Sequence, residues 1–266
     1  MARQVGLDAA GARVLRDAHN TLVLLPEPAV AAKVAHTTGN GTAEPLEREL
    51  AIGLHLAAHD APTVRPLPDG TAGPYELEGR VLTLWSYCAP GPASEQPGLE
   101  LGRALRAVHE ALADFPGPLP RFTEKLEDAA ALFADATATP ELSASDRRLT
   151  AMIYDTLQSR LETGGTPRAL HGEPHSDNVI WTLNGPVFVD FEAACIGPVE
   201  WDLGFLPEQA REAFPERDQE LVASLCEAIS FCVAGWCWAQ RGTAPEIDEA
   251  AAFHLDVLRR AASATS

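Results

Sequence analysis

The sequence predicts an α+β fold with two lobes, and three features of the chain lead to that prediction. Residues 1–86 hold short apolar runs separated by turns and one helical pattern, which is typical of a small antiparallel sheet with a single helix. Residues 87–266 carry mainly helical stripes. Between them, residues 88–92 interrupt the chain with two prolines and a glycine. We therefore expect a small lobe over 1–86 and a larger, mainly helical lobe over 87–266.

The elements of the small lobe follow from turn residues and hydrophobic periodicity. Residues 22–25 form an apolar run that ends at Pro26, and residues 29–35 form a second one, so the two runs predict a β-hairpin. Apolar residues recur every three or four positions over 46–58, which predicts a helix. The continuous apolar run 81–85 predicts a buried strand.

The larger lobe is predicted from a series of helical patterns with one return to short strands. We expect helices over 101–112, 121–136, 145–162, 216–240 and 246–262, and short strands around a loop over 169–191. Residues 221–239 are the most apolar stretch of the chain. That stretch contains Glu227 and lacks flanking basic clusters, so we interpret it as a buried core helix rather than a membrane span.

Composition narrows the class of protein and of partner. The 266 residues include 20 Lys plus Arg against 38 Asp plus Glu, a formal charge of −18. A chain this acidic is a poor candidate for nucleic acid or anionic membranes and favours a cationic partner. Only two residues are lysines, Lys33 and Lys125. Five cysteines without a C-x-x-C pair, and an N-terminus without an apolar segment, indicate a cytoplasmic protein with reduced thiols.

Polar groups with metal-binding chemistry concentrate in residues 170–203. The apolar runs 179–181 and 187–189 flank Asn184-Gly185, which is a strong hairpin turn signal. Such a hairpin brings Asn178, at the start of one strand, beside Asp190, at the end of its partner. An amide oxygen and a carboxylate held together form half of a hard-oxygen shell suited to Mg²⁺. Glu173 lies on the loop just before, where a carboxylate can orient a hydroxyl group.

These motifs resemble a known family. His171-Gly172-Glu173, Asn178 and Asp190, followed by the Gly-Pro-Val-Glu-Trp-Asp-Leu run of 197–203, are similar to the catalytic loop and metal-binding Asp of aminoglycoside phosphotransferases. That family belongs to the protein-kinase-like small-molecule kinases, with choline and fructosamine kinases as relatives. The resemblance implies a bilobal protein-kinase-like fold with a small antiparallel-sheet lobe and a larger helical lobe. One position departs from the family pattern, since Glu173 stands where the family has Asp.

The resemblance implies transfer of a phosphoryl group from ATP or GTP to a small-molecule hydroxyl. Glu173 is then the residue that orients the hydroxyl, His171 braces the loop, and Asn178 and Asp190 hold Mg²⁺. Such a reaction needs positioning and charge neutralisation more than covalent chemistry. Asp202 is expected to cap the loop from the adjoining helix.

Weaker matches in the small lobe complete a nucleotide site in the order that the family implies. Lys33 corresponds to the lysine that touches the α- and β-phosphates, and Glu49, after Arg48 on the next helix, to its ion-pair partner. Asn20, in the loop 17–21, corresponds to a residue that covers the nucleotide. The inter-lobe hinge, whose backbone would bind adenine, is matched by Trp85, Ser86 and Tyr87.

The acceptor is predicted less directly. Four acidic residues after the metal site are candidates to line an acidic pocket: Glu192, Glu200, Asp202 and Glu208, with plain surface charge as the alternative for Glu200 and Glu208. Together with the net charge, they favour a cationic acceptor such as an aminoglycoside-like antibiotic, and hence a role in antibiotic resistance. A metabolic kinase of an amino alcohol, a glycated amine or a sugar is a second possibility. A nucleotide-binding pseudokinase, disabled by the extra methylene of Glu173, is a third.

Other site types are disfavoured. His171 and His175 have the H-x₃-H spacing of a zinc site, but Pro174 between them disfavours the helix that such a site needs. The chain has no P-loop, no Rossmann glycine motif and no nucleophile elbow.

Overall fold

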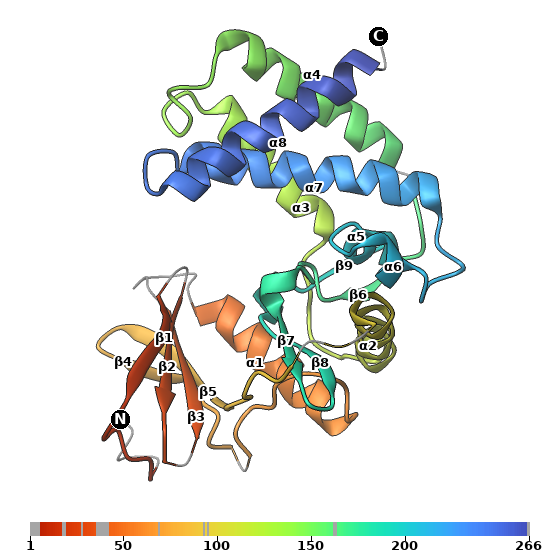
Figure 1. Ribbon diagram of the computed structural model, residues 1–266. Helices are drawn as coiled ribbons and strands as arrows, with labels where there is room; N and C mark the ends of the chain where they lie inside the picture. Colours follow the sequence, from red (N-terminus) through yellow and green to blue (C-terminus); the bar gives the residue numbers. More distant parts are fainter. Residues whose placement is uncertain are drawn as a thin grey trace. The chain divides into compact units, whose positions relative to one another are not determined.

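The computed structural model describes residues 6–17, 20–27, 29–35, 43–68, 70–92, 94, 96–161 and 164–264. They divide into two compact units (Figure 1). The first unit comprises Met1–Pro118, His171–Ala194 and Leu206–Phe214, and the second comprises Leu119–Leu170, Cys195–Phe205 and Pro215–Ser266. The sequence analysis expected a single boundary near residue 86. That boundary stays a prediction, because the compact units group segments that are far apart in the chain.

The first unit is built on a five-stranded antiparallel sheet of order β1-β2-β3-β5-β4. Its strands are β1 (Arg13–Asp17), β2 (Asn20–Leu25), β3 (Val30–Ala35), β4 (Tyr75–Leu77) and β5 (Arg80–Ser86). The predicted hairpin is confirmed, with Leu22 opposite Lys33 and Leu25 opposite Val30. β1 was not predicted, because it is a mostly exposed edge strand without a regular apolar alternation.

The alternation of side chains along β3 decides which face Lys33 occupies. Val30 and Ala32 pack on one face of the sheet with Leu82 and Leu84. Ala31 packs on the other face, with Leu50 of helix α1 (Ala43–Ala58). Successive residues of a strand point to opposite faces, so Lys33 shares the face of Ala31 and is directed toward α1.

Helix α2 (Pro97–Leu112) confirms the helical stripe predicted from the sequence. Leu101, Leu105, Val108 and Leu112 are all buried. α2 packs closely on the short helix α6 (Glu208–Arg211), where a side chain on Gly102 would collide with the backbone of Ala210.

The hairpin of β7 (Val179–Thr182) and β8 (Gly185–Phe188) is also confirmed. Its turn differs in detail from the prediction, because Thr182 pairs with Gly185 and the two central residues are Leu183 and Asn184. Gly185 follows them with φ of +106°, a conformation that favours glycine. The hydroxyl of Thr182 accepts the Asn184 N–H at 3.0 Å and donates to the Gly185 carbonyl at 2.8 Å, which closes the turn.

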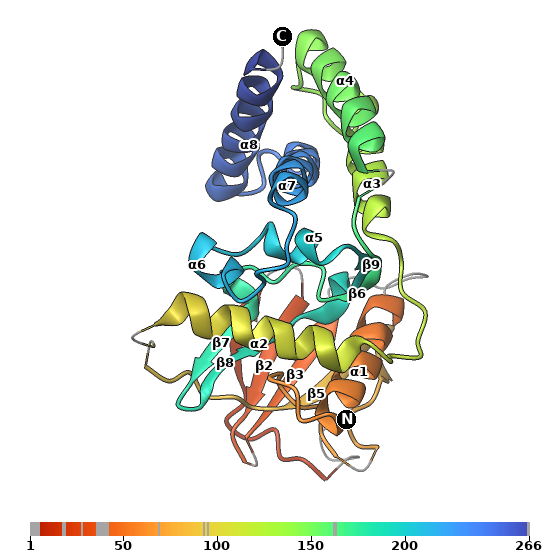
Figure 2. The same cartoon turned by 90° about the vertical axis from the view of Figure 1, so that its right-hand side faces the viewer.

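The second unit is mainly helical. Its elements are α3 (Phe122–Ala134), α4 (Ala144–Leu161), α5 (Val199–Leu203), α7 (Gln219–Ala239), α8 (Pro245–Ala264), and the strands β6 (Arg168–Leu170) and β9 (Cys195–Gly197), which pair with each other. The four long helices confirm the predicted ones. Figure 2 shows α7 between α8 and the α3–α4 pair.

Helix α7 is the one helix among the described residues that is long and apolar enough to cross a membrane by length and composition. The core helix of a folded domain meets the same criterion. Here Leu225, Ala228 and Phe231 of α7 are fully buried in a common core with residues of α3, α4 and α8. The predicted role of this stretch as a core helix agrees with that packing.

Candidate active site

The loop that follows β6 is braced from inside by His171. Its side chain is completely buried and its ring packs against Phe188 and Phe191. Nε2 lies 3.1 Å from the carbonyl oxygen of Val189, and Nδ1 accepts the N–H of Glu173 at 3.4 Å. These contacts tie the loop to the chain just before Asp190.

The backbone around Glu173 is fixed at several points. Gly172 has φ of +91°, and a side chain there would collide with the carbonyl of Ala193, so this position requires glycine. The carbonyl of Glu173 accepts the N–H of His175 at 2.8 Å and the side-chain amide of Asn178 at 3.0 Å. The Glu173 side chain therefore starts from a rigid backbone.

Asn178 ends a short 3₁₀ turn (Ser176–Asn178) and begins the hairpin. Its carbonyl accepts the N–H of Val189 at 3.0 Å, so the ladder of β7 and β8 continues by one residue and brings Asp190 next to Asn178. The Nδ2 atom of Asn178 is directed at the Glu173 carbonyl. Because Nδ2 is engaged there, the side-chain oxygen is the atom of Asn178 that can serve as a metal ligand.

Lys33 forms the centre of the site. Its Nζ atom lies 2.8 Å from Glu49 Oε2, 3.0 Å from Asp190 Oδ1 and 2.5 Å from Glu192 Oε1. β3, α1 and the turn after β8 each contribute to this cluster. Asp190 reaches it from a left-handed backbone conformation with φ of +67°, which Asp tolerates better than most residues. The side chain of Asp190 remains 40% exposed, whereas those of Lys33 and Glu49 are 11% and 5% exposed.

Burial and charge have opposite effects on these groups. Burial disfavours the ammonium of Lys33, but Glu49, Asp190 and Glu192 outweigh it and hold the pKa of Lys33 above its ordinary value. Burial raises the pKa of Glu49 to about 7, and the two neighbouring carboxylates add to the rise while Lys33 opposes it. For Asp190, burial opposes ionisation but the attraction of Lys33 prevails and lowers the pKa.

The cluster carries more negative charge than Lys33 can neutralise. Three carboxylates face one ammonium, and the oxygens of Glu49, Asp190 and Glu192 lie within 4.8 Å of one another. Carboxylate oxygens and the oxygen of Asn178 are the hard ligands that Mg²⁺ prefers. The donor set of this structure therefore fits a divalent cation at Asp190 and Asn178.

Glu192 has a different place from the one expected. The sequence analysis assigned it to an acceptor pocket, whereas the structure puts its carboxylate on Lys33 and on the side-chain amide of Asn20, whose Nδ2 donates at 2.6 Å. Arg48 donates to the Glu192 carbonyl at 3.1 Å, a positioning role that the sequence did not reveal. Asn20 thus lies with the predicted phosphate-binding residues, while positions 18 and 19 of its loop are outside the described residues.

The predicted hinge is a well-bonded end of β5. The N–H of Ser86 donates to the Arg65 carbonyl at 2.8 Å, and that of Tyr87 donates to the Ala29 carbonyl at 3.1 Å. Trp85 is buried and its indole N–H donates to the Thr83 hydroxyl at 2.8 Å. These N–H groups are therefore already engaged within the protein.

The other predicted acceptor residues do not form one group. Glu200 is buried in α5, and its carboxylate accepts the N–H of Asp218 at 3.1 Å, so it is not a plain surface charge. Asp202 is completely buried in the same helix. Glu208 is exposed and forms an ion pair of 3.4 Å with Arg211.

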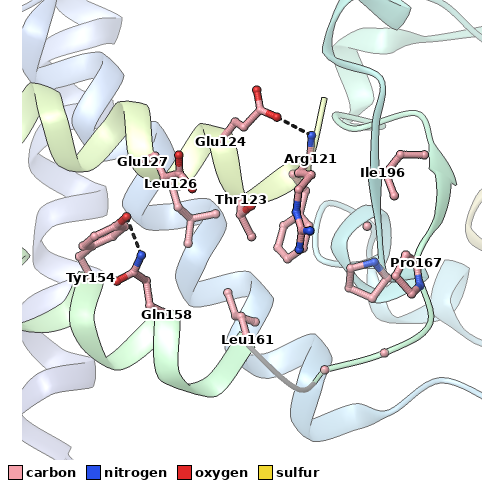
Figure 3. Close-up of a pocket in the computed structure, with 15 residues that line it drawn as sticks. Arg121, Thr123, Glu124, Leu126, Glu127, Tyr154, Gln158, Leu161, Pro167 and Ile196 are labelled. Carbon is pink, nitrogen blue, oxygen red and sulfur yellow. Dashed lines mark hydrogen bonds between the residues drawn. The ribbon is translucent and has the colours of Figure 1, made fainter. Parts of the chain in front are cut away.

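A separate groove of about 860 Å³ lies within the second unit. It is lined by α3, α4 and the segments 164–167 and 196–198 (Figure 3). The apolar side chains of Leu126 and Leu161 form part of its wall. Glu124 and Glu127 of α3 contribute carboxylates to the lining. None of the residues predicted for catalysis, nucleotide or acceptor lines this groove.

Comparison with known proteins assigns the chain to a family. Residues 4–241 match the model of the phosphotransferase enzyme family. The chain belongs to that family. It is therefore a phosphotransferase, and the resemblance found in residues 170–203 is confirmed. A search among curated proteins finds no match to the chain.

Solved structures share the protein-kinase-like fold of this family. Amicoumacin kinase hAmiN, in complex with AMP-PNP, Ca²⁺ and its ligand, is similar with a TM-score of 0.76 at 12% identity, over 95% of this chain and 89% of that one. A microcompartment-associated aminopropanol kinase gives 0.74 at 18% identity, over 99% and 96%. The GDP and kanamycin complex of APH(2″)-IIIa gives 0.72 at 15% identity, over 98% and 96%. At these identities the likeness establishes the predicted fold.

Proposed function

We propose that this phosphotransferase moves the γ-phosphate of ATP or GTP to a hydroxyl group of a small cationic molecule, with an aminoglycoside-like antibiotic as the leading class of acceptor. The observation that supports the donor is the buried Lys33, which three carboxylates hold at 3.0 Å or less. A lysine fixed in this way is a preformed site for nucleotide phosphates.

Lys33 binds the α- and β-phosphates in this proposal, and Glu49 keeps its ammonium in place. Glu49 is the appropriate anchor because it is buried on α1, whereas Asp190 is partly exposed and free to face the phosphates. Arg48 donates to the backbone carbonyl of Glu192, and Asn20 donates to the Glu192 carboxylate. Both residues therefore position Glu192 next to Lys33.

Asn178 and Asp190 hold Mg²⁺ in this proposal. When bound, such an ion would supply positive charge that neutralises the charge developing during transfer. The excess negative charge around Lys33 supplies the electrostatic reason for recruiting a divalent cation. Asp190 presents its carboxylate from the turn after β8, and Asn178 presents its amide oxygen from the first residue of the hairpin.

Glu173 orients the acceptor hydroxyl by accepting a hydrogen bond from it. Its carboxylate is one methylene farther from the backbone than that of Asp, and a misplacement of about 1 Å can cost roughly 10²-fold in rate. The backbone bonds from His175 and Asn178 set where the longer side chain begins. The acceptor hydroxyl accordingly sits farther from the loop than it would with Asp.

The nucleotide base meets the chain just beyond β5. The N–H groups of Ser86 and Tyr87 are engaged, Pro90 has none, and Gly91 donates to the Trp181 carbonyl at 2.6 Å. Among the described residues of this linker, the amides of Cys88 and Ala89 are then the ones positioned to bind the base edge. Gly91 and Trp181 line a small adjoining pocket of about 330 Å³.

The cationic acceptor and the cytoplasmic location are supported by composition. The formal charge of −18 favours a positively charged substrate. All five cysteines are free thiols, as expected in a reducing compartment that also supplies the nucleotide.

The test is a transfer assay with ATP and GTP against a panel of aminoglycosides, other cationic antibiotics, amino alcohols and neutral sugars, with products identified by mass spectrometry. We expect phosphorylated cationic antibiotics, formed only with Mg²⁺ present. Phosphorylation of amino alcohols or sugars alone would replace the acceptor class. Nucleotide binding without product in the wild type, with transfer restored by Glu173→Asp, would support a pseudokinase and overturn the proposal.

A further inference from the structure

A second cluster of potential metal ligands lies at the other end of α1, away from Lys33. His55 is in the last turn of the helix, His59 follows four residues later, and Asp114 lies just after α2. The His55 Nε2 atom is 3.2 Å from Asp114 Oδ1, and the His59 Nε2 atom is 3.6 Å from the same oxygen. All three ligand atoms lie within 4.8 Å of one another. Figure 2 shows the C-terminal end of α2 beside α1.

These distances match the geometry of zinc coordination. Zinc binds imidazole nitrogen and carboxylate oxygen at about 2.0–2.2 Å, so neighbouring ligand atoms in a tetrahedron are about 3.3–3.5 Å apart. The two measured ligand pairs, at 3.2 and 3.6 Å, lie on either side of that value. Two histidines one helical turn apart present their rings on one face, which the 4.4 Å separation of the ring centroids confirms.

Backbone carbonyl groups contact the ring nitrogens of both histidines and influence which nitrogen carries the proton. His59 Nδ1 lies 2.9 Å from the carbonyl oxygen of His55. A proton on Nδ1 satisfies that carbonyl and leaves Nε2 as the metal-binding nitrogen, which is the arrangement usual for ligating histidines. His55 Nε2 lies 2.8 Å from the Ala111 carbonyl, so metal binding requires His55 to carry its proton on Nδ1 instead. Binding also requires the Ala111 carbonyl oxygen, which lies where a metal on Nε2 would sit, to move aside, and both changes lower the affinity.

We propose that His55, His59 and Asp114 bind Zn²⁺ through three protein ligands with one open position. The ligand set of two imidazoles and a carboxylate suits zinc better than Mg²⁺, which prefers oxygen ligands. The ion joins the end of α1 to the segment after α2, and α1 carries Arg48 and Glu49. The site is thus a metal clamp on the helix that anchors Lys33, and it is independent of the proposed phosphoryl-transfer reaction.

Zn²⁺ titration of the chelator-treated full chain by calorimetry, without nucleotide or Mg²⁺, tests the proposal. Variants His59→Ala and Asp114→Asn change exposed ligands, and Glu110→Gln is a matched control because Glu110 is an exposed carboxylate on α2 that pairs with Arg106. We expect one equivalent of Zn²⁺ to bind to the wild type and to Glu110→Gln. In the two ligand variants the affinity for this equivalent should fall by more than about 10-fold, the lower bound for losing an outer contact.

Two further measurements do not depend on the calorimetric signal. Co²⁺ in place of Zn²⁺ should give the visible absorption of a tetrahedral site in the wild type and lose it in His59→Ala. Zn²⁺ should raise the melting temperature of the wild type and not that of Asp114→Asn, because a ligand that binds only the folded state stabilises it. Absence of binding at about pH 7.5 would overturn the proposal, as would equal binding by all four proteins.

Discussion

Helix α1 contributes to two candidate cation sites of opposite character, one near its middle and one at its end. Glu49 is 5% exposed and shares the buried Lys33 with Asp190 and Glu192. The side chains of His59 and Asp114 are 40% and 73% exposed, and that of His55 is 14% exposed. Burial among carboxylates suits the proposed phosphate and Mg²⁺ site, whereas exposed imidazoles offer nitrogen ligands to a softer ion. Side-chain chemistry and burial together, rather than the helix, decide which cation each site takes.

The largest expected effect belongs to Glu173, which acts on the reacting hydroxyl. Glu173→Gln removes the proton acceptor and should lower kcat by about 10²–10⁴-fold, the usual range for a lost acid–base group. Steady-state transfer kinetics measure this. Asp177→Asn is the matched control, because Asp177 is an exposed acid in the same loop. A larger loss in Asp177→Asn than in Glu173→Gln would assign the base to Asp177.

Lys33→Met should have the next largest effect. It removes the positive charge that receives the phosphates, and loss of one preorganised electrostatic contact costs about 10²–10³-fold in kcat. Lys125→Met, which changes the only other lysine, should leave transfer unchanged. Comparable losses in the two variants would show that bulk charge, and not the site around Lys33, supports activity.

A smaller effect is expected on the free energy of unfolding, whose pH dependence should reflect the buried Glu49. The pKa of Glu49 is raised from 4.5 to about 7, so its contribution to stability is complete below pH 4.5 and is lost as the pH rises through 7. Urea unfolding should therefore show a wild-type free energy that falls between about pH 5 and pH 7.5. Glu49→Gln should flatten this fall, and Glu47→Gln, an exposed position of the same helix, should not. An unchanged slope in Glu49→Gln would contradict the raised pKa.

The smallest expected effect on phosphoryl transfer is that of His59→Ala. This variant tests whether the proposed zinc site at the end of α1 is independent of the site around Lys33. With a Zn²⁺ chelator and excess Mg²⁺ present, His59→Ala should keep wild-type kcat and KM, because the polar contacts of His59 are with the His55 carbonyl and Asp114 rather than with Lys33 or the catalytic loop. Steady-state kinetics with the preferred acceptor provide the measurement. A loss of transfer under these conditions would mean that the end of α1 acts on the catalytic site without metal.

The sequence predicts those parts of the site that depend on local geometry. His171, Glu173 and Asn178 lie on one loop, and the hairpin that follows carries Asp190 back beside Asn178. Turn chemistry and strand alternation over about twenty residues are enough to derive that arrangement. The face of the sheet on which Lys33 lies is also set by local sequence, because side chains alternate between the two faces along β3.

Contacts between distant segments could not be derived in the same way. Glu192 is 172 residues from Asn20 and 144 from Arg48, and no local pattern indicates that it reaches them. The two H-x₃-H pairs make the same point. Pro174 disfavours a helical zinc site at His171 and His175, whereas only the folded structure brings Asp114 to His55 and His59.

The central claim is that the carboxylates around Lys33 serve Mg²⁺-dependent phosphoryl transfer. The most direct test compares wild type with Asp190→Asn for acceptor-stimulated nucleotide turnover at several Mg²⁺ concentrations, with nucleotide binding followed by calorimetry. We predict that wild type turns over with a cationic acceptor, and that Asp190→Asn retains nucleotide binding but loses turnover at every Mg²⁺ concentration. Equal turnover by both proteins, or no nucleotide binding by wild type, would contradict the claim.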